Sequence, residues 1–276
     1  MKTLSNHTIL YDAECPMCKM YTSAFTHVGM LDKTGAQPYQ QMSAKFCPFV
    51  DQKRAVNEIA LVNNSTGEVT YGIQSLFKVL GNAMPVFIPL FAFQPFIWLM
   101  TKLYAFISYN RKVVIPSAVN EQSQGLQPDF KLTYRLVYLL FTWLVASFIL
   151  TRYAVLLEGM VPVGGVWREY FICAGQMLFQ ALVLLLLDRK QIWTYLGNMM
   201  TVSFAGALLL LPVIALGTII HIPALYCTGY FLIVAGLMFL EHFRRMTLLQ
   251  LGYWPTLTWL LYRLLLLFVI LFLSII

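Results

Sequence analysis

Five long apolar runs in the second half of the chain constrain its fold more than any other feature. They lie approximately at residues 133–150, 166–187, 195–219, 224–240 and 256–276. A helix rising about 1.5 Å per residue needs roughly 20 residues to cross about 30 Å of hydrocarbon, and these runs approach that length. Because lipid offers the backbone no hydrogen-bond partner, and the runs are too long for barrel strands, we expect five transmembrane helices.

Composition places the whole chain among membrane proteins, but unevenly. Hydrophobic residues make up 59% of it and charged residues only 11%, with a mean hydropathy of +0.69, outside the range of soluble domains. Of the 31 Asp, Glu, Lys and Arg residues, 18 lie in the first 130 positions. We therefore expect a polar domain over residues 1–112, a linker over 113–130 and an all-α membrane domain over 131–276.

The distribution of Lys and Arg predicts the orientation, because these residues resist translocation. Alternate loops carry most of them, namely Lys131 and Arg135, Arg189 and Lys190, and Arg244 and Arg245. The opposite side carries only Arg152 and Arg168. Since the N-terminal stretch lacks the features of a secretory signal, we expect an integral protein of the bacterial inner membrane with its N-terminal domain in the cytosol.

Residues 85–107 are apolar enough to form a sixth span, which would place the N-terminal domain outside. Three prolines, Pro85, Pro89 and Pro95, interrupt this segment. Proline removes a helical hydrogen bond and clashes with the preceding turn. We expect broken helices that lie on the membrane surface or against the spans.

The sequence of the polar domain predicts alternating strands and helices. Short β-prone runs occupy residues 8–11, 36–42, 58–62 and 68–71, and helical spacing covers 18–30, 43–54 and 73–80. In the first helix, Met20, Ala24, Phe25 and Val28 form a candidate buried stripe. The order β-α-β-α-β-β-α predicts an α/β domain of the thioredoxin-like class.

The stretch YDAECPMC places Cys15 and Cys18 at the first strand-to-helix junction, as redox-active thioredoxin-like domains do. Cys15 is expected at the N-cap with Pro16 as the first helical residue, where unpaired N–H groups and the helix dipole favour a thiolate. Cys18 lies nearly one turn further, within reach of Cys15. Lys19 also favours the thiolate, whereas Glu14 and Asp12 oppose it, so the sequence leaves the sign of the net pKa shift of Cys15 open.

These features predict dithiol–disulfide exchange, in which Cys15 attacks a substrate disulfide and Cys18 resolves the intermediate. The substrate is a protein or small-molecule disulfide or thiol, and no bound cofactor is required. The net charge of +7 fits anionic lipid in the bilayer better than nucleic acid.

The same residues resemble a known family. Asp12, Cys15 and Cys18 match the Asp-x-x-Cys-x-x-Cys signature of the DCC family of predicted thiol-disulfide oxidoreductases. TYGIQSLFKVL, PVFIPL and LYAFISYNRKVV resemble further stretches of that family, the last through Tyr104 and the Asn110-Arg111 pair. The likeness covers roughly residues 5–115. It implies a redox role for the two cysteines and leaves the five spans unexplained.

Two positions depart from the related patterns. Ala13 stands where the family usually has Gly. Asn57 aligns best with the cis-proline that thioredoxin-like proteins place beside the disulfide. A non-proline cis bond costs about 2.5–4 kcal/mol, so we expect a trans bond at Asn57.

Several residues admit two interpretations. Asp12 is either a proton relay for Cys18 or a turn and capping residue. Cys47 is a third reactive thiol or a packed one, and Arg111 pairs with an acid or a lipid phosphate, or anchors the membrane segment. The cysteine pair could instead be half of a zinc site, with Cys47, His7 and His27 as the other candidates.

The membrane half contains three further candidates. Arg263, about two turns into the last run, is either functional or extends to the cytosolic surface. Cys173 and Cys227 are either packed or accept electrons across the membrane. Two alternative functions therefore remain open: a membrane lipid- or small-molecule-binding protein with a redox-sensing or docking domain, and a transmembrane electron relay.

Overall fold

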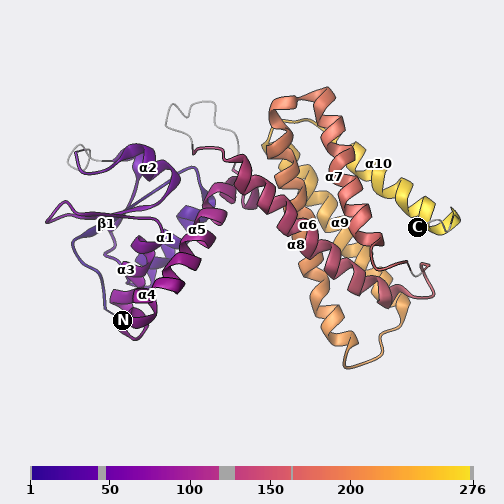
Figure 1. Ribbon diagram of the computed structural model, residues 1–276, viewed down its shortest axis with the longest axis horizontal. Helices are drawn as coiled ribbons and strands as arrows, with labels where there is room; N and C mark the ends of the chain where they lie inside the picture. The colour runs from indigo at the N-terminus through magenta and orange to yellow at the C-terminus, as the bar shows by residue number, and fades with distance from the viewer. Residues whose placement is uncertain (1, 43–47, 118–127, 163, 274–276) are drawn as a thin grey trace. The chain divides into compact units, whose positions relative to one another are not determined.

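The computed structural model describes residues 2–42, 48–117, 128–162 and 164–273 (Figure 1). The chain divides into two compact units, Met1–Tyr134 and Arg135–Ile276. The first contains the sheet, and the second contains the long apolar helices. Each unit is described by itself below.

The first unit is built on a small mixed sheet of four strands. They are β1 (His7–Tyr11), β2 (Ala36–Pro38), β3 (Ala60–Asn63) and β4 (Val69–Tyr71), in the order β2-β1-β3-β4. Strand β1 runs parallel to β2 and antiparallel to β3, and β3 runs antiparallel to β4. The α/β character and all four strands expected from the sequence are therefore present.

Helices cover both faces of this sheet. They are α1 (Pro16–His27), α2 (Gln52–Asn57), α3 (Ile73–Ala83) and α5 (Gln94–Val114). Successive strand residues face opposite sides: Ile9 and Leu61 pack with α1, α3 and α5, whereas Leu10 and Val62 lie in the cluster that includes α2. The sheet thus forms the middle of three layers.

The second strand and second helix differ from the expected boundaries. β2 ends at Pro38, and a short 3-10 helix, η1 (Tyr39–Gln41), follows it. Helix α2 begins at Gln52, because the Asp51 side chain accepts the N–H of Arg54 at 3.1 Å and caps the helix there. The prediction of a helix starting at residue 43 is therefore wrong over residues 48–51, and residues 43–47 lie outside the described residues.

The buried stripe expected on the first helix is also wrong in part. Met20 is 63% exposed and Val28, which follows the end of α1, is 51% exposed. The buried residues of α1 are Cys18 and Thr22, because the face that carries the second cysteine packs on the sheet. Phe25 does contact the core, as expected.

Residues 85–114 form broken helices. A 3-10 turn, η2 (Pro85–Phe87), leads into α4 (Ile88–Ala92), and α5 then leaves at an angle of 89°. The break falls at Phe93, just before Pro95, as the prolines predict. By length and composition, this bent pair is either one broken membrane span or a re-entrant loop. Tyr104 and Arg111 of α5 pack inside the first unit.

Among its described residues, the second unit contains five helices long and apolar enough to cross a membrane. They are α6 with η3 (Leu132–Ala154 and Val155–Leu157), α7 (Arg168–Leu187), η4 with α8 (Arg189–Gln191 and Ile192–Gly217), α9 (Ala224–Leu248) and α10 with η5 (Trp254–Phe268 and Val269–Leu273). Only 11% to 39% of each apolar window is buried inside the structure. The remaining apolar surface is compatible with contact with lipid, as in an integral membrane protein.

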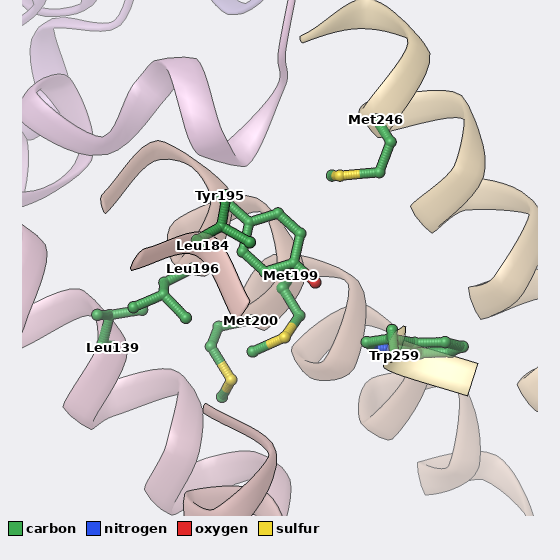
Figure 2. Close-up of a cluster of buried hydrophobic side chains, with 8 residues drawn as sticks. All are labelled: Leu139, Leu184, Tyr195, Leu196, Met199, Met200, Met246 and Trp259. Atoms are coloured by element: carbon green, nitrogen blue, oxygen red, sulfur yellow. The ribbon is translucent and has the colours of Figure 1, made fainter. Parts of the chain in front are cut away.

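A sulfur-rich apolar cluster holds one end of this helix unit together. Figure 2 shows its buried members: Leu139, Leu184, Tyr195, Leu196, Met199, Met200, Met246 and Trp259. They come from all five helices, so packing here fixes the arrangement of the helices at this end. A second cluster around Tyr153, Leu210 and Cys227 fills the other end.

Candidate functional site

The two cysteines of the first unit lie where β1 passes into α1. Cys15 is the N-cap residue of α1 with extended backbone angles, and Pro16 is the first helical residue. The backbone N–H of Cys18 donates to Sγ of Cys15 at 3.3 Å. Both cysteines are free thiols. The helix start therefore places the Cys15 sulfur where a negative charge gains most from unpaired amides.

Asp12 organises the loop before these cysteines. Its Oδ1 accepts the backbone N–H of Glu14 at 3.0 Å and the side-chain amide of Gln40 at 2.8 Å. Gln40 also accepts the N–H of Ala13 at 3.1 Å. Asp12 thus forms an Asx turn, the second of the two roles considered for it, and no described hydrogen bond joins it to the Cys18 thiol.

Arg111 reaches this loop from the last turn of α5. Its Nη2 donates to Oδ2 of Asp12 at 3.0 Å and to the carbonyl of Val56 at 2.8 Å. The Arg111 and Asp12 side chains are only 6% and 4% exposed. Arg111 therefore pairs with an acid, and it ties the cysteine loop to the segment just before β3.

The environment makes the two thiols unequal. Hydrogen bonding to the Cys18 side chain, helped by the charge of Arg111, lowers the pKa of Cys15 from 9.0 to about 7, although burial and Asp12 oppose this. The same hydrogen bond and burial raise the pKa of Cys18. At neutral pH the arrangement favours a Cys15 thiolate that accepts a hydrogen bond from a protonated Cys18.

Tyr21 lies on the same side of α1 as Cys18, one turn further. The charge of Arg111 and, to a smaller extent, the neighbouring Tyr21 hydroxyl act to lower the pKa of Cys18. Burial is the largest cause of the raised pKa of Tyr21 itself. Tyr21 is therefore a neutral donor beside the second thiol.

Both sulfur-bearing residues are buried. Cys15 is 5% exposed and Cys18 is 4% exposed. A disulfide substrate needs direct access to Sγ of the attacking thiol. Any exchange reaction at Cys15 therefore requires the residues around it to move aside.

The segment before β3 contains Asn57, the position aligned with the thioredoxin cis-proline. Among the described residues no peptide bond is cis, as expected for Asn57. Its carbonyl accepts the Ser108 hydroxyl at 2.5 Å. Its side-chain Nδ2 donates to Oδ2 of Asp129 at 3.0 Å, and its Oδ1 accepts the backbone N–H of Asp129 at 2.9 Å. These two bonds attach the chain just before α6 to the segment before β3.

The structure adds a cation to the one that the sequence places beside the cysteines. Lys19 is exposed, and the cation that acts on both thiols is Arg111. The Asn-Arg pair in the family resemblance was the one signal that pointed to it. Gln40, which supports the loop, carried no such signal.

The remaining candidates are not joined to this site. Cys47 lies outside the described residues. Within the described ranges no three His, Cys, Asp or Glu side chains gather as they would around a metal ion. Cys173 of α7 and Cys227 of α9 are free thiols in the second unit, and Cys227 belongs to the apolar cluster around Tyr153.

Arg263 packs on an aromatic side chain of its own helix. Its guanidinium lies 4.0 Å from the centre of the Trp259 ring, one turn closer to the start of α10. Its Nε is buried. The guanidinium therefore lies against the indole ring on the side of the start of α10.

Comparisons with known proteins add no relative: no family model matches the chain, and neither the curated proteins nor the solved structures contain a match.

Proposed function

We propose that this protein is a membrane-anchored thiol-disulfide oxidoreductase that uses Cys15 and Cys18. The observation that carries the proposal is the N-cap geometry of Cys15, with the Cys18 N–H 3.3 Å from its sulfur. A thiol in this position is activated as a nucleophile, and its partner is one turn away.

The architecture of the first unit supports a thioredoxin-like identity. Its sheet order is β2-β1-β3-β4 with the cysteine pair directly after β1, and helices α1 and α3 lie on the face opposite α2. Together with the Asp12, Cys15 and Cys18 signature, this arrangement is our reason for placing the unit in the DCC family.

The proposed reaction moves two electrons from the dithiol to a substrate disulfide. The Cys15 thiolate attacks one substrate sulfur, so a Cys15–substrate disulfide forms and the other substrate sulfur leaves as a thiolate. Cys18 then loses its proton and attacks Sγ of Cys15, which releases the second substrate thiolate and forms the Cys15–Cys18 disulfide. A dithiol reductant restores both thiols.

Asp12 and Arg111 act in this reaction as positioning residues. Asp12 holds the loop through Glu14 and Gln40. Arg111 supplies a fixed positive charge that lowers the pKa of Cys15 and opposes the rise in the pKa of Cys18. During resolution, the charge of Arg111 favours deprotonation of Cys18 once Cys15 has become part of a disulfide and no longer accepts its hydrogen bond.

The burial of the thiols adds an opening step before the chemistry. With Cys15 only 5% exposed, substrate reacts in the fraction of time that the site is open. The observed exchange rate is then the intrinsic thiolate rate multiplied by that fraction.

We place the first unit in the cytosol of a bacterial cell, with the second unit in the inner membrane. The support is the Lys and Arg content of alternate loops, including Arg189 and Lys190 between α7 and α8, and Arg244 and Arg245 at the end of α9. In that compartment a cellular dithiol reductant resets the pair.

The test measures reduction of an aromatic disulfide that absorbs light when cleaved, with the full chain in nanodiscs and dithiothreitol as reductant. We expect Cys15→Ser to abolish the catalysed rate, because it removes the attacking sulfur. Cys173→Ser, which removes a thiol of the membrane unit, should leave the rate unchanged. Equal rates for the wild type and Cys15→Ser would contradict the proposal.

A further inference from the structure

A polar chain of side chains runs through one end of the membrane unit. The Tyr195 hydroxyl donates to Oε1 of Gln180 at 3.0 Å and lies 3.3 Å from Nε2 of His242. His242 stacks on the Trp259 ring at 5.0 Å between centroids. These side chains come from α7, α8, α9 and α10, and Figure 2 shows Tyr195 and Trp259 within the apolar cluster beside them.

Four nitrogen donors around this polar chain have no hydrogen-bond partner among the described residues. They are Nε2 of Gln176, Nε2 of Gln180, Nε1 of Trp259 and Nε of Arg263. Three of these residues are deeply buried, with exposed fractions of at most 5%: Gln176, Gln180 and Trp259. A buried donor without a partner costs about 1–3 kcal/mol, more for a charged group, so four in one place require an explanation.

The four donors are carried by two helices, α7 and α10, that meet along one seam. Two hydrogen bonds define this seam: Thr258 donates to Oε1 of Gln180 at 3.3 Å, and the Tyr262 hydroxyl donates to the carbonyl of Ile172 at 3.0 Å. Gln176 lies on α7 midway between those two contacts. Trp259 and Arg263 are the residues that directly follow Thr258 and Tyr262 on α10.

Arg263 also lacks a countercharge within the described part of the chain. The acidic side chains of the second unit are Glu158, Glu169, Asp188 and Glu241. Glu169 pairs with Arg168, Glu241 pairs with Arg244 and Arg245, and Asp188 caps η4. Glu158 is exposed in the loop after η3. Arg263 takes part in none of the ion pairs of the described residues, and its guanidinium lies over the Trp259 ring.

The chemistry of the missing partner follows from these groups. Indole and guanidinium nitrogens only donate hydrogen bonds, so the ligand must supply acceptor oxygens, and a metal cation is excluded. The unpaired guanidinium favours an anionic acceptor over a neutral one. A carboxylate or a phosphate meets both requirements.

The surroundings indicate that this anion carries an apolar tail. Gln180 lies seven residues from the end of α7 and Arg263 nine residues from the start of α10, which corresponds to depths of about 10–14 Å along the helices. Exposed leucines flank the seam on both helices, namely Leu178 and Leu182 on α7 and Leu261, Leu264 and Leu265 on α10. A free anion has no path through this surface, whereas an acidic amphiphile lies along it.

We propose that Gln176, Gln180, Trp259 and Arg263 bind the oxyanion headgroup of a membrane amphiphile, a fatty acid carboxylate or a lipid phosphate, at the seam between α7 and α10. This site lies wholly in the second unit and is independent of the dithiol.

The test uses photoactivatable probes with the full chain in phosphatidylcholine nanodiscs. The probes are a diazirine fatty acid, the fatty alcohol of the same chain length and a diazirine phosphatidic acid. We expect the acidic probes to label α7 and α10 peptides at least about fivefold more than the alcohol, because only they pair with Arg263. Labelling by the fatty acid identifies a carboxylate ligand, and labelling by phosphatidic acid alone identifies a lipid phosphate.

Variants separate the site from general partitioning into the bilayer. Arg263→Gln should lower labelling by about tenfold, the effect of losing a hydrogen-bonded charge. Arg152→Gln is the matched control, since Arg152 is an exposed cation over the Phe148 ring of α6, and it should change nothing. Trp259→Phe keeps an aromatic ring but removes the N–H together with part of the indole, so it should lower labelling about threefold.

The two proposals fail separately. The double change of Cys15 and Cys18 to Ser should leave the labelling intact, although it removes disulfide exchange. If Arg263→Gln does not fold, as judged by size-exclusion chromatography, Trp259→Phe decides the result. Equal labelling by acid and alcohol, or labelling that survives in every folded variant of the site, overturns the binding site.

Discussion

Arg111 and Asp12 form a buried ion pair, Nη2 to Oδ2 at 3.0 Å, across 99 positions of sequence. The pair joins the last turn of α5 to the loop that carries Cys15. Removing one partner of a buried pair leaves the other charge uncompensated. The cysteine loop and the end of α5 should therefore be linked in stability and in thiol chemistry.

The first prediction concerns the stability of this link. Asp12→Asn should destabilise the first unit by about 3–5 kcal/mol, because Arg111 then keeps its charge without a counterion. The measurement is hydrogen exchange of the β1 and β3 amides in the full chain. Asp51→Asn is the control, since Asn caps a helix as well as Asp does, and it should leave the exchange unchanged. Equal protection in the two variants would contradict the structural role of the pair.

The second prediction concerns the charge of Arg111. Arg111→Gln should raise the pKa of Cys15, because the guanidinium charge lowers it. The pH midpoint of Cys15 alkylation should therefore move upward. Lys112→Gln removes the same charge from the next, exposed residue and should shift the midpoint much less. Identical midpoints for the two variants would remove Arg111 from the account.

The third prediction is the pH dependence of the wild-type site. The pKa of Cys15 is lowered to about 7 and that of Cys18 is raised. The thiolate fraction of Cys15 rises as pH rises through 7, so alkylation by iodoacetamide should increase about tenfold per pH unit below 7 and level off above it. Mass spectrometry of the modified peptide should find Cys15 labelled first. A midpoint near 9.0 would mean that Cys15 behaves as an ordinary thiol.

The fourth prediction tests how α5 supports the sheet. The Tyr104 hydroxyl accepts the backbone N–H of Ile59 at 3.0 Å. Tyr104→Phe leaves that buried amide without a partner and should destabilise the first unit by about 1–3 kcal/mol. Tyr134→Phe keeps a ring stacked on Tyr109 and should have little effect. Hydrogen exchange at Ile59 distinguishes the variants, and unchanged protection in Tyr104→Phe would show that this bond does not contribute.

The sequence was sufficient wherever a local pattern determines structure. The five apolar runs predicted the five long helices, because hydrocarbon thickness sets a length that sequence displays directly. The order Cys15-Pro16 predicted the N-cap, because the preferences at a helix start are local. The break near Pro95 has the same kind of cause.

The parts that sequence reasoning missed depend on contacts between distant residues. Lys19 stands next to the cysteines in sequence but is exposed, whereas the charge that lowers the pKa of Cys15 belongs to Arg111, near the end of α5. The buried face of α1 was misread because Met20 is apolar yet points to solvent, whereas Thr22 is polar yet buried and bonded to the carbonyl of Cys18 at 2.7 Å. Hydrophobicity alone does not identify a face whose position is set by a functional residue.

The most direct measurement of the central claim is trapping of the mixed disulfide. The full chain with Cys18→Ser cannot resolve an intermediate, so an aromatic disulfide probe should remain attached through a disulfide at Cys15, seen as one added mass on the peptide that contains it. The account predicts this adduct on Cys15, with loss on reduction, and no adduct at that position in Cys15→Ser. Absence of any adduct at Cys15, or the same adduct mainly on Cys173 or Cys227, would contradict the account.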